Sequence, residues 1–177
     1  MESVKIKIEK LFDSIKEKFG YKNKFQSPRI EKVVISTGTG SITDREKLEL
    51  IPDRLAKITG QAPVATVAKK SIAGFKLREG QVVGHKVTLR GDRMYQFLDK
   101  LIHIALPRTK DFRGLPIDSI DEMNNYTIGI KEHTIFPETS DEELKNVFGL
   151  AVTIVTTAKT KEEAEELLRQ IGLPFKK

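Results

Sequence analysis

The spacing of apolar residues predicts two helices in the first third of the chain. Residues 4–19 carry apolar side chains at steps of three and four, which is typical of an amphipathic helix, and Gly20 ends the pattern. Residues 44–59 carry a second stripe of this kind, with Thr43 placed as its N-cap. Pro52 lies within the second stripe. It predicts a kink or a break into two short helices, because proline removes a backbone donor and clashes with the preceding turn.

Two further helices are predicted in the rest of the chain. One begins at Asp92, shows a broad apolar stripe and ends at Leu106. The other is capped by Thr160, with Glu163 three residues later, and Gly172 ends it. Both patterns have one apolar face, so both helices are expected to pack against other elements.

Five segments alternate in polarity or are rich in β-branched residues, as strands are. Val87 and Leu89 alternate with Lys86 and Arg90, so their strand has one apolar and one basic face. Strands and helices follow one another in mixed order. This indicates an α+β fold in a single domain, residues 1–177, with helices on one face of an antiparallel sheet and the other face open. The predicted strands span residues 31–37, 61–68, 82–90, 125–131 and 150–157.

The positive charge of the chain is concentrated in residues 61–113. This third holds 11 basic and 4 acidic side chains, whereas residues 114–177 have a net charge of −5 and the whole chain has +6. Gly74, Gly80 and Gly84 loosen the most basic stretch, which runs into the strand with the basic face. Cations that share one strand face and flank a glycine loop favour a nucleic acid as partner over a merely solvated surface.

Composition excludes several other classes of protein. The chain of 177 residues has no cysteine. Disulfides and thiolate metal sites are therefore excluded, and a reducing compartment is allowed. No apolar run approaches the roughly 20 residues that a membrane span needs, and the charged N-terminus is unlike a secretory signal. We expect a cytoplasmic protein with no membrane partner.

Catalysis has little support in the sequence. The three histidines, His85, His103 and His133, lie in different elements, and no short histidine–carboxylate spacing for a metal is present. The turn from Thr37 to Ser41 has two glycines. It lacks the third glycine of a dinucleotide fingerprint and the Lys-Ser/Thr ending of a phosphate loop. We predict that the protein is not an enzyme and holds no cofactor and no metal.

The open face predicted for the sheet has no aromatic residue. Readers of single-stranded RNA usually place aromatic rings on such a face, where bases stack on them. Ser36, Lys86, Thr88 and Arg90 are expected there instead. This favours a folded RNA, with lysine and arginine supplying affinity and short polar side chains supplying geometrically demanding hydrogen bonds.

Five blocks of the sequence carry a resemblance to a known family. In chain order they are QSPRIEKVVISTGTG, ITGQAPVATVAKKSIAGFKLREG, GHKVTLRGDRMYQFLDKLIHIALPRTKDFRGL, NYTIGIKEHTIFPE and GLAVTIVTTAKTKEEAEELL. They resemble the bacterial large-subunit ribosomal protein family L5 (uL5), which binds 5S rRNA in the central protuberance. The resemblance implies a five-stranded antiparallel sheet with helices packed behind it, no enzymatic activity, and a location in the large ribosomal subunit.

The resemblance also implies which residues contact RNA. The open face and its edges would grip 5S rRNA at the matching positions Ser36, Gln61 and Thr88. The loop Ser71–Gly84 would correspond to the arm that the family directs toward the elbow of the peptidyl-site tRNA. The candidate residues are Ser36, Gln61, Lys69, Lys70, Lys86, Thr88 and Arg90 for rRNA, and Lys76, Arg78 and Gln81 for the tRNA.

Other partners follow from the same resemblance. They are large-subunit rRNA, neighbouring proteins of the central protuberance and a basic small-subunit protein in an intersubunit bridge. The region after Pro107 and the acidic stretch Asp141–Glu143 would face that bridge protein, for which the negative charge of this part of the chain is physically suitable. The alternative interpretation is an RNA-binding regulatory or remodelling module that acts away from ribosomes.

One position departs from the family pattern. The family usually has asparagine where this chain has Ser36. Asparagine has separate donor and acceptor groups, while serine is shorter and has a single donor. We expect a weaker or water-bridged contact with 5S rRNA at this position.

Overall fold

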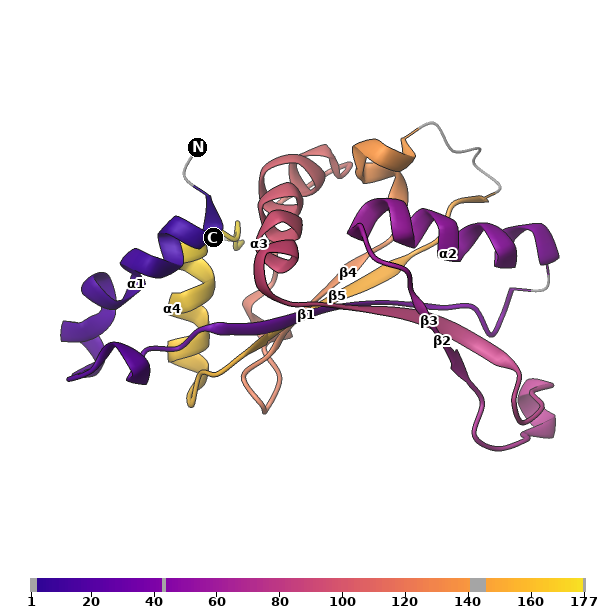
Figure 1. Ribbon diagram of the computed structural model, residues 1–177, viewed down its shortest axis with the longest axis horizontal. Coiled ribbons are helices and arrows are strands. Elements are labelled where there is room, and N and C mark those ends of the chain that lie inside the picture. The colour runs from indigo at the N-terminus through magenta and orange to yellow at the C-terminus, as the bar shows by residue number, and fades with distance from the viewer. Residues whose placement is uncertain (1–2, 43, 141–145, 177) are drawn as a thin grey trace. The chain divides into compact units, whose positions relative to one another are not determined.

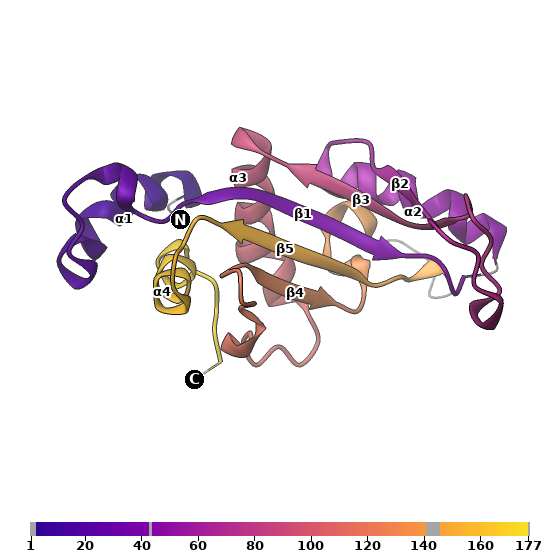
Figure 2. The same ribbon diagram turned by 90° about the horizontal axis from the view of Figure 1, so that it is seen from below.

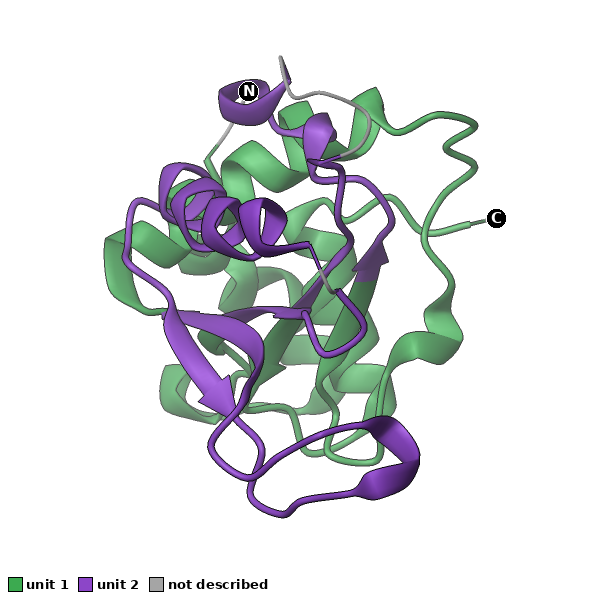
Figure 3. Ribbon diagram, turned by 90° about the vertical axis from the view of Figure 1, so that its right-hand side faces the viewer, with its two compact units in different colours: residues 1–33, 89–128, 153–177 green, residues 34–88, 129–152 purple. Residues whose placement is uncertain are grey.

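The computed structural model describes residues 3–42, 44–140 and 146–176. The chain divides into two compact units, shown in Figure 3. Unit 1 comprises Met1–Val33, Leu89–Ile128 and Thr153–Lys177. Unit 2 comprises Val34–Thr88 and Gly129–Val152.

The strands form a single five-stranded antiparallel sheet, which confirms the predicted α+β fold. They are β1 (Ile30–Gly38), β2 (Val64–Val67), β3 (Val82–Leu89), β4 (Tyr126–Ile130) and β5 (Leu150–Thr156). The order is β2-β3-β1-β5-β4, and Figure 2 shows the strands from β3 to β4 side by side. All of the predicted strands are present, but β2 is only four residues long and begins three residues later than the predicted strand 61–68.

Four α-helices accompany the sheet, at the places where the apolar stripes predict them. They are α1 (Val4–Phe19), α2 (Arg45–Thr59), α3 (Gly91–Lys100) and α4 (Lys161–Ile171). The centre of each stripe is buried: Leu11 and Ile15 in α1 and Leu55 and Ile58 in α2 are at most 2% exposed. Burying one such side chain contributes about 1.5–3 kcal/mol, so the stripes account for the docking of the helices.

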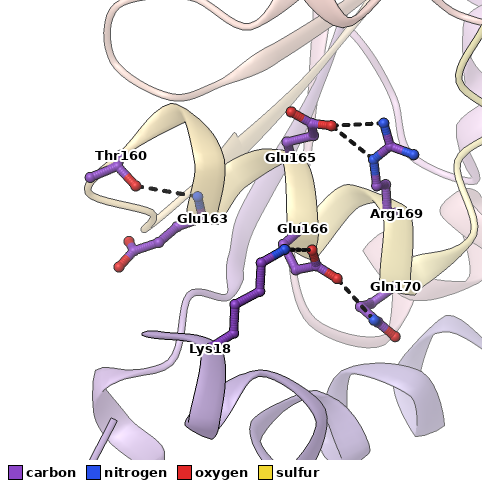
Figure 4. Close-up of polar contacts among 7 residues, drawn as sticks. All are labelled: Lys18, Thr160, Glu163, Glu165, Glu166, Arg169 and Gln170. Atoms are coloured by element: carbon purple, nitrogen blue, oxygen red, sulfur yellow. Dashed lines mark hydrogen bonds and ion pairs between the residues drawn. The ribbon is translucent and has the colours of Figure 1, made fainter. Parts of the chain in front are cut away.

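In unit 1, α1 lies against α4, and polar contacts join the two helices (Figure 4). The amino group of Lys18 pairs with the carboxylate of Glu166 and, with a hydrogen bond from Gln170, lowers the pKa of that carboxyl. The hydroxyl of Tyr21 donates to Oε1 of Glu163 at 2.6 Å, and burial together with this bond raises the pKa of Tyr21. These contacts join the first helix to the last.

The residues that cap α4 are the ones that the sequence predicts. Oγ1 of Thr160 accepts a hydrogen bond from the backbone N–H of Glu163 at 3.3 Å (Figure 4), and Gly172 ends the helix at φ +98°. This left-handed conformation favours glycine. The predicted start and end of this helix are both confirmed.

In unit 2, α2 lies on one side of the strands β1 and β3, as Figure 1 shows. It turns Ile51, Leu55 and Ile58 inward and ends at Gly60. The other side of these strands is not covered by α2, and the candidate residues for rRNA are expected there.

Two details of α2 differ from the prediction. The predicted break into two helices at Pro52 is wrong, since one continuous helix runs from Arg45 to Thr59. The N-cap is Asp44, whose carboxylate accepts from the backbone N–H of Glu46 at 3.1 Å. The predicted cap, Thr43, lies outside the described residues.

The third helix changes its winding before it ends. After Lys100 the chain continues as a π-helix over Leu101–Ala105 and then as a 3-10 turn over Leu106–Arg108. The predicted apolar stripe runs through all three segments, and Leu101 and Ala105 are fully buried. The pattern therefore predicted the extent of the helix but not the wider π turns.

Candidate RNA-binding surface

Burial alternates along β1 and β3 in unit 2 and separates their two faces. Ile35 and Val87 are buried at 0% and 1% exposure, while Ser36 and Thr88 are half-buried and Lys86 is exposed. Neighbouring strand residues point to opposite faces. The side chains of Ser36, Lys86 and Thr88 therefore share the uncovered face, as the sequence predicts.

A close backbone approach flattens the uncovered face between these strands. A Cβ atom on Gly84 would lie 2.7 Å from the carbonyl oxygen of Thr37 and 2.9 Å from Oγ1 of Thr66. The backbone N–H of Thr39 donates to the carbonyl of Val83 at 2.9 Å next to this point. Glycine is thus required for steric reasons, and Gly84 is buried beside the side chain of Thr66.

Gln61 is held against β3 rather than projecting freely. Its Nε2 donates to the carbonyl oxygen of Thr88 at 3.3 Å, and its backbone N–H donates to Oγ1 of Thr59 at 3.3 Å. The side-chain oxygen of Gln61 has no hydrogen-bond partner among the residues that the structure describes. The structure therefore brings Gln61 and Thr88 together and leaves one amide acceptor for another molecule.

The pairing of β2 with β3 adds another residue to the uncovered face. Val64 lies opposite Lys86, and Thr66 lies opposite Gly84. Cross-strand partners project on the same side of an antiparallel sheet, so Thr66 shares the uncovered face with Lys86. The sequence alone does not indicate Thr66, because it does not give the register between the two strands.

The loop between β2 and β3, residues 68–81, folds back on itself as an arm. Ile72 and Leu77 exchange two backbone hydrogen bonds of 3.1 and 3.2 Å around the short turn Ala73–Phe75. Oγ of Ser71 accepts from the backbone N–H of Glu79 at 2.9 Å. The arm is thus closed by its own hydrogen bonds, although the sequence suggested only a loose glycine loop.

The candidate residues of the arm differ in their roles. Lys76 and Arg78 are both exposed, and Lys76 adopts a left-handed conformation at φ 53° where the turn closes. Gln81 is exposed as well, but its Oε1 accepts from the backbone N–H of Arg78 at 3.2 Å. Lys69 and Lys70 lie at the base of the arm and are also accessible. The lysine and arginine side chains of the arm are therefore accessible to a binding partner, and Gln81 stabilises the backbone of the arm.

Arg90 belongs to unit 1, unlike the other candidate residues for rRNA. It is exposed and occupies the N-cap position of α3, where its side chain makes no capping hydrogen bond. Lys32 in β1 belongs to the same unit and is half-exposed. Its alternation with Val33 places it on the polar face of its strand, so the sequence contained the signal that would have added it to the candidate set.

The basic loop after Pro107 is tied to the C-terminal tail within unit 1. The backbone N–H of Leu115 donates to the carbonyl of Pro174 at 2.8 Å, and Gly114 adopts φ +97°. A Cβ atom on Gly114 would lie 2.7 Å from the backbone nitrogen of Lys176. The acidic stretch 141–143, predicted to face a bridge protein, lies outside the described residues.

The described residues give no sign of a catalytic centre. Among them, no group of three or more His, Asp or Glu side chains is arranged to hold a metal ion. His85 is half-buried beside the core, and burial lowers its pKa. Across the described ranges, none of the helices is long and apolar enough to cross a membrane.

Comparison with known proteins identifies the family. The sequence model for "Ribosomal protein L5" matches residues 23–78, and the model for the C-terminus of the same ribosomal family matches residues 82–175. The large ribosomal subunit protein uL5 of Heliobacterium modesticaldum is 56% identical over 161 residues, which cover 90% of this chain and 89% of that protein.

These matches define a ribosomal protein, a structural constituent of the large subunit that associates with rRNA and is not an enzyme. The chain belongs to the ribosomal protein L5 family. The family, the ribosomal location and the lack of enzymatic activity predicted from the sequence are confirmed.

Proposed function

We propose that the uncovered face of unit 2 binds 5S rRNA. The observation that carries this proposal is the cluster around Thr88, where a hydroxyl, the amide of Gln61 and the exposed cation Lys86 lie together. Lysine supplies sequence-independent attraction to phosphate, and short polar groups add contacts whose geometry selects one folded RNA.

The flatness of the face supports the same partner. Gly84 has no side chain where it lies against Thr37 and Thr66, and Ser36 and Thr66 are short. A sugar–phosphate backbone can therefore come close to the sheet. Since none of these side chains is aromatic, shape and 2′-hydroxyl contacts account for recognition better than base stacking.

The arm, residues 68–81, is proposed to contact the peptidyl-site tRNA. Lys76 and Arg78 are accessible on a loop that its own hydrogen bonds close. A loop that is already ordered loses less conformational entropy on binding than a flexible one. Gln81 contributes by bracing Arg78.

A bridge contact with a basic small-subunit protein is proposed for the acidic part of the chain, together with contacts to neighbouring proteins of the central protuberance. Residues 114–177 have a net charge of −5. Glu132 and Glu138 are exposed in the described part of this region. Opposite net charges accelerate association and favour the correct partner.

A mobility-shift titration with transcribed 5S rRNA tests the main proposal. We expect binding that weakens by about 0.7–0.9 log units per log unit of salt for each phosphate contacted. A paired hairpin of equal length serves as the control and should bind more weakly. Equal affinity for both RNAs, or binding that does not depend on salt, would contradict the proposal.

A further inference from the structure

Two aromatic rings of the described residues are strongly exposed: Phe75 on the arm, at 74%, and Phe25 on the turn between α1 and β1. Phe25 is 90% exposed, the largest exposure among the large hydrophobic side chains of the described residues. Lys22, Lys24 and Arg29 are exposed around it, and no acidic residue occurs between Gly20 and Ile30. The ring is therefore surrounded in sequence by positive charge alone.

The turn that carries Phe25 is held by its own polar residues. Oδ1 of Asn23 accepts from the backbone N–H of Phe25 at 3.0 Å. Oε1 of Gln26 accepts from the backbone N–H groups of Lys22 and Asn23 at 2.9 and 3.3 Å, which completes a capping box. The side chains of Asn23 and Gln26 thus fix the backbone without covering the ring.

The end of this turn is also anchored within unit 1. The backbone N–H of Arg29 donates to Oγ1 of Thr157 at 3.0 Å, and the backbone N–H of Thr157 donates to the carbonyl of Arg29 at 2.9 Å. The short segment 23–29 is therefore fixed at both ends. A ring presented on such a frame can bind a flat partner with little loss of backbone freedom.

The charge around the ring decides which flat partner fits. Met123, in the same unit, is also strongly exposed at 75%, but its neighbours in sequence are the acidic Asp121 and Glu122. Around Phe25 the neighbours are cations, which attract phosphate. An exposed aromatic ring flanked by cations is the arrangement with which proteins bind unpaired nucleotides.

We infer that Phe25 is a stacking platform for an unpaired base of RNA, with Lys22, Lys24 and Arg29 receiving the phosphates on either side. This site goes beyond the proposed 5S rRNA surface, which uses the uncovered face and lies in unit 2. It also uses a different physical interaction, because the uncovered face has no aromatic ring.

The absence of tryptophan from the chain allows a direct test. The variant Phe25→Trp introduces a single indole, whose fluorescence is followed while RNA is added to the whole chain. Two RNAs are used in separate titrations: a single strand of about twelve adenines, within the site sizes of such binders, and transcribed 5S rRNA. Met123→Trp is the matched control, an equally simple replacement at an exposed apolar position. We expect quenching for Phe25→Trp with at least one of these RNAs and none for Met123→Trp.

Affinity measurements with the quenching RNA separate stacking from charge. Phe25→Ala should weaken binding by about 5- to 150-fold with an unchanged dependence on salt, whereas Phe25→Tyr should bind like the original chain. Lys24→Ala should reduce the slope of log affinity against log salt by about 0.7.

Two results would overturn the inference. One is unchanged fluorescence of Phe25→Trp with both RNAs, and the other is full affinity of Phe25→Ala. Either result would leave the 5S rRNA proposal standing if the mobility shift with 5S rRNA persisted. Conversely, quenching of Phe25→Trp by the adenine RNA would support the stacking site even if 5S rRNA failed to bind the uncovered face.

Discussion

Gly84 lies so close to Thr37 that a Cβ atom on the glycine would come within 2.7 Å of the threonine carbonyl oxygen. The same atom would lie 2.9 Å from Oγ1 of Thr66 on the other neighbouring strand. Three strands of the sheet therefore meet around one residue that has no side chain. A side chain at position 84 would therefore force β1 or Thr66 to move.

Gly84→Ala is predicted to destabilise the protein by about 1–3 kcal/mol, because backbone atoms of β1 must move to admit the methyl group. Chemical denaturation followed by circular dichroism measures the change. Gly129→Ala is the matched control in β4, where a Cβ atom would meet nothing within 4 Å. A cost for Gly84→Ala no larger than for Gly129→Ala would show that the approach is not tight.

Thr88→Ala is predicted to weaken binding of 5S rRNA by about 1 kcal/mol, the typical contribution of one hydrogen bond, while the free energy of unfolding stays nearly constant. The hydroxyl lies on the uncovered face, and the bond from Gln61 goes to the backbone carbonyl of Thr88, which the substitution retains. Mobility shift and denaturation are measured on the same preparation. Unfolding of the variant would mean that the face is assigned wrongly.

Ser36→Asn is predicted to strengthen binding of 5S rRNA. Ser36 is half-buried on the uncovered face, and asparagine adds a second polar group that reaches further. Ser36→Ala should weaken binding, and the two variants together define the direction of the effect. If Ser36→Asn bound more weakly than Ser36→Ala, the position would be too crowded to contact RNA.

His85 is predicted to make stability depend on pH below about 6.5. Burial lowers the pKa of His85 from its ordinary value of 6.5 in the folded chain, so between the two values the unfolded chain binds a proton that the folded chain does not. Stability should therefore fall as pH falls through this window. Replacing His85 by Gln should make the decline below about pH 6.5 shallower, as thermal unfolding at a series of pH values would show. An unchanged decline would contradict the assignment.

Much of the fold was predictable because each element has a strong local pattern. The alternation around Val87 placed Lys86 and Thr88 on the uncovered face, and the capping residues Thr160 and Gly172 fixed the last helix. These signals need only neighbouring residues, so they can be recognised without the tertiary structure.

Features that depend on partners distant in the sequence could not be predicted. The need for glycine at position 84 comes from Thr37 and Thr66 on two other strands. Likewise, the exposure of Phe25 depends on how the turn after α1 is capped, and a phenylalanine in a sequence is usually assigned to the core. At Pro52 a local signal is misleading: proline favours a break in a helix, yet α2 is continuous there.

The most direct measurement locates the surface that binds 5S rRNA. We would compare the affinity of the Lys86→Ala, Thr88→Ala double variant with that of Lys57→Ala, which removes the same charge from α2 in the same unit. We predict a loss of about tenfold or more for the double variant and a salt slope smaller by about 0.7–0.9, with little change for Lys57→Ala. Equal losses in the two proteins would contradict binding through the uncovered face.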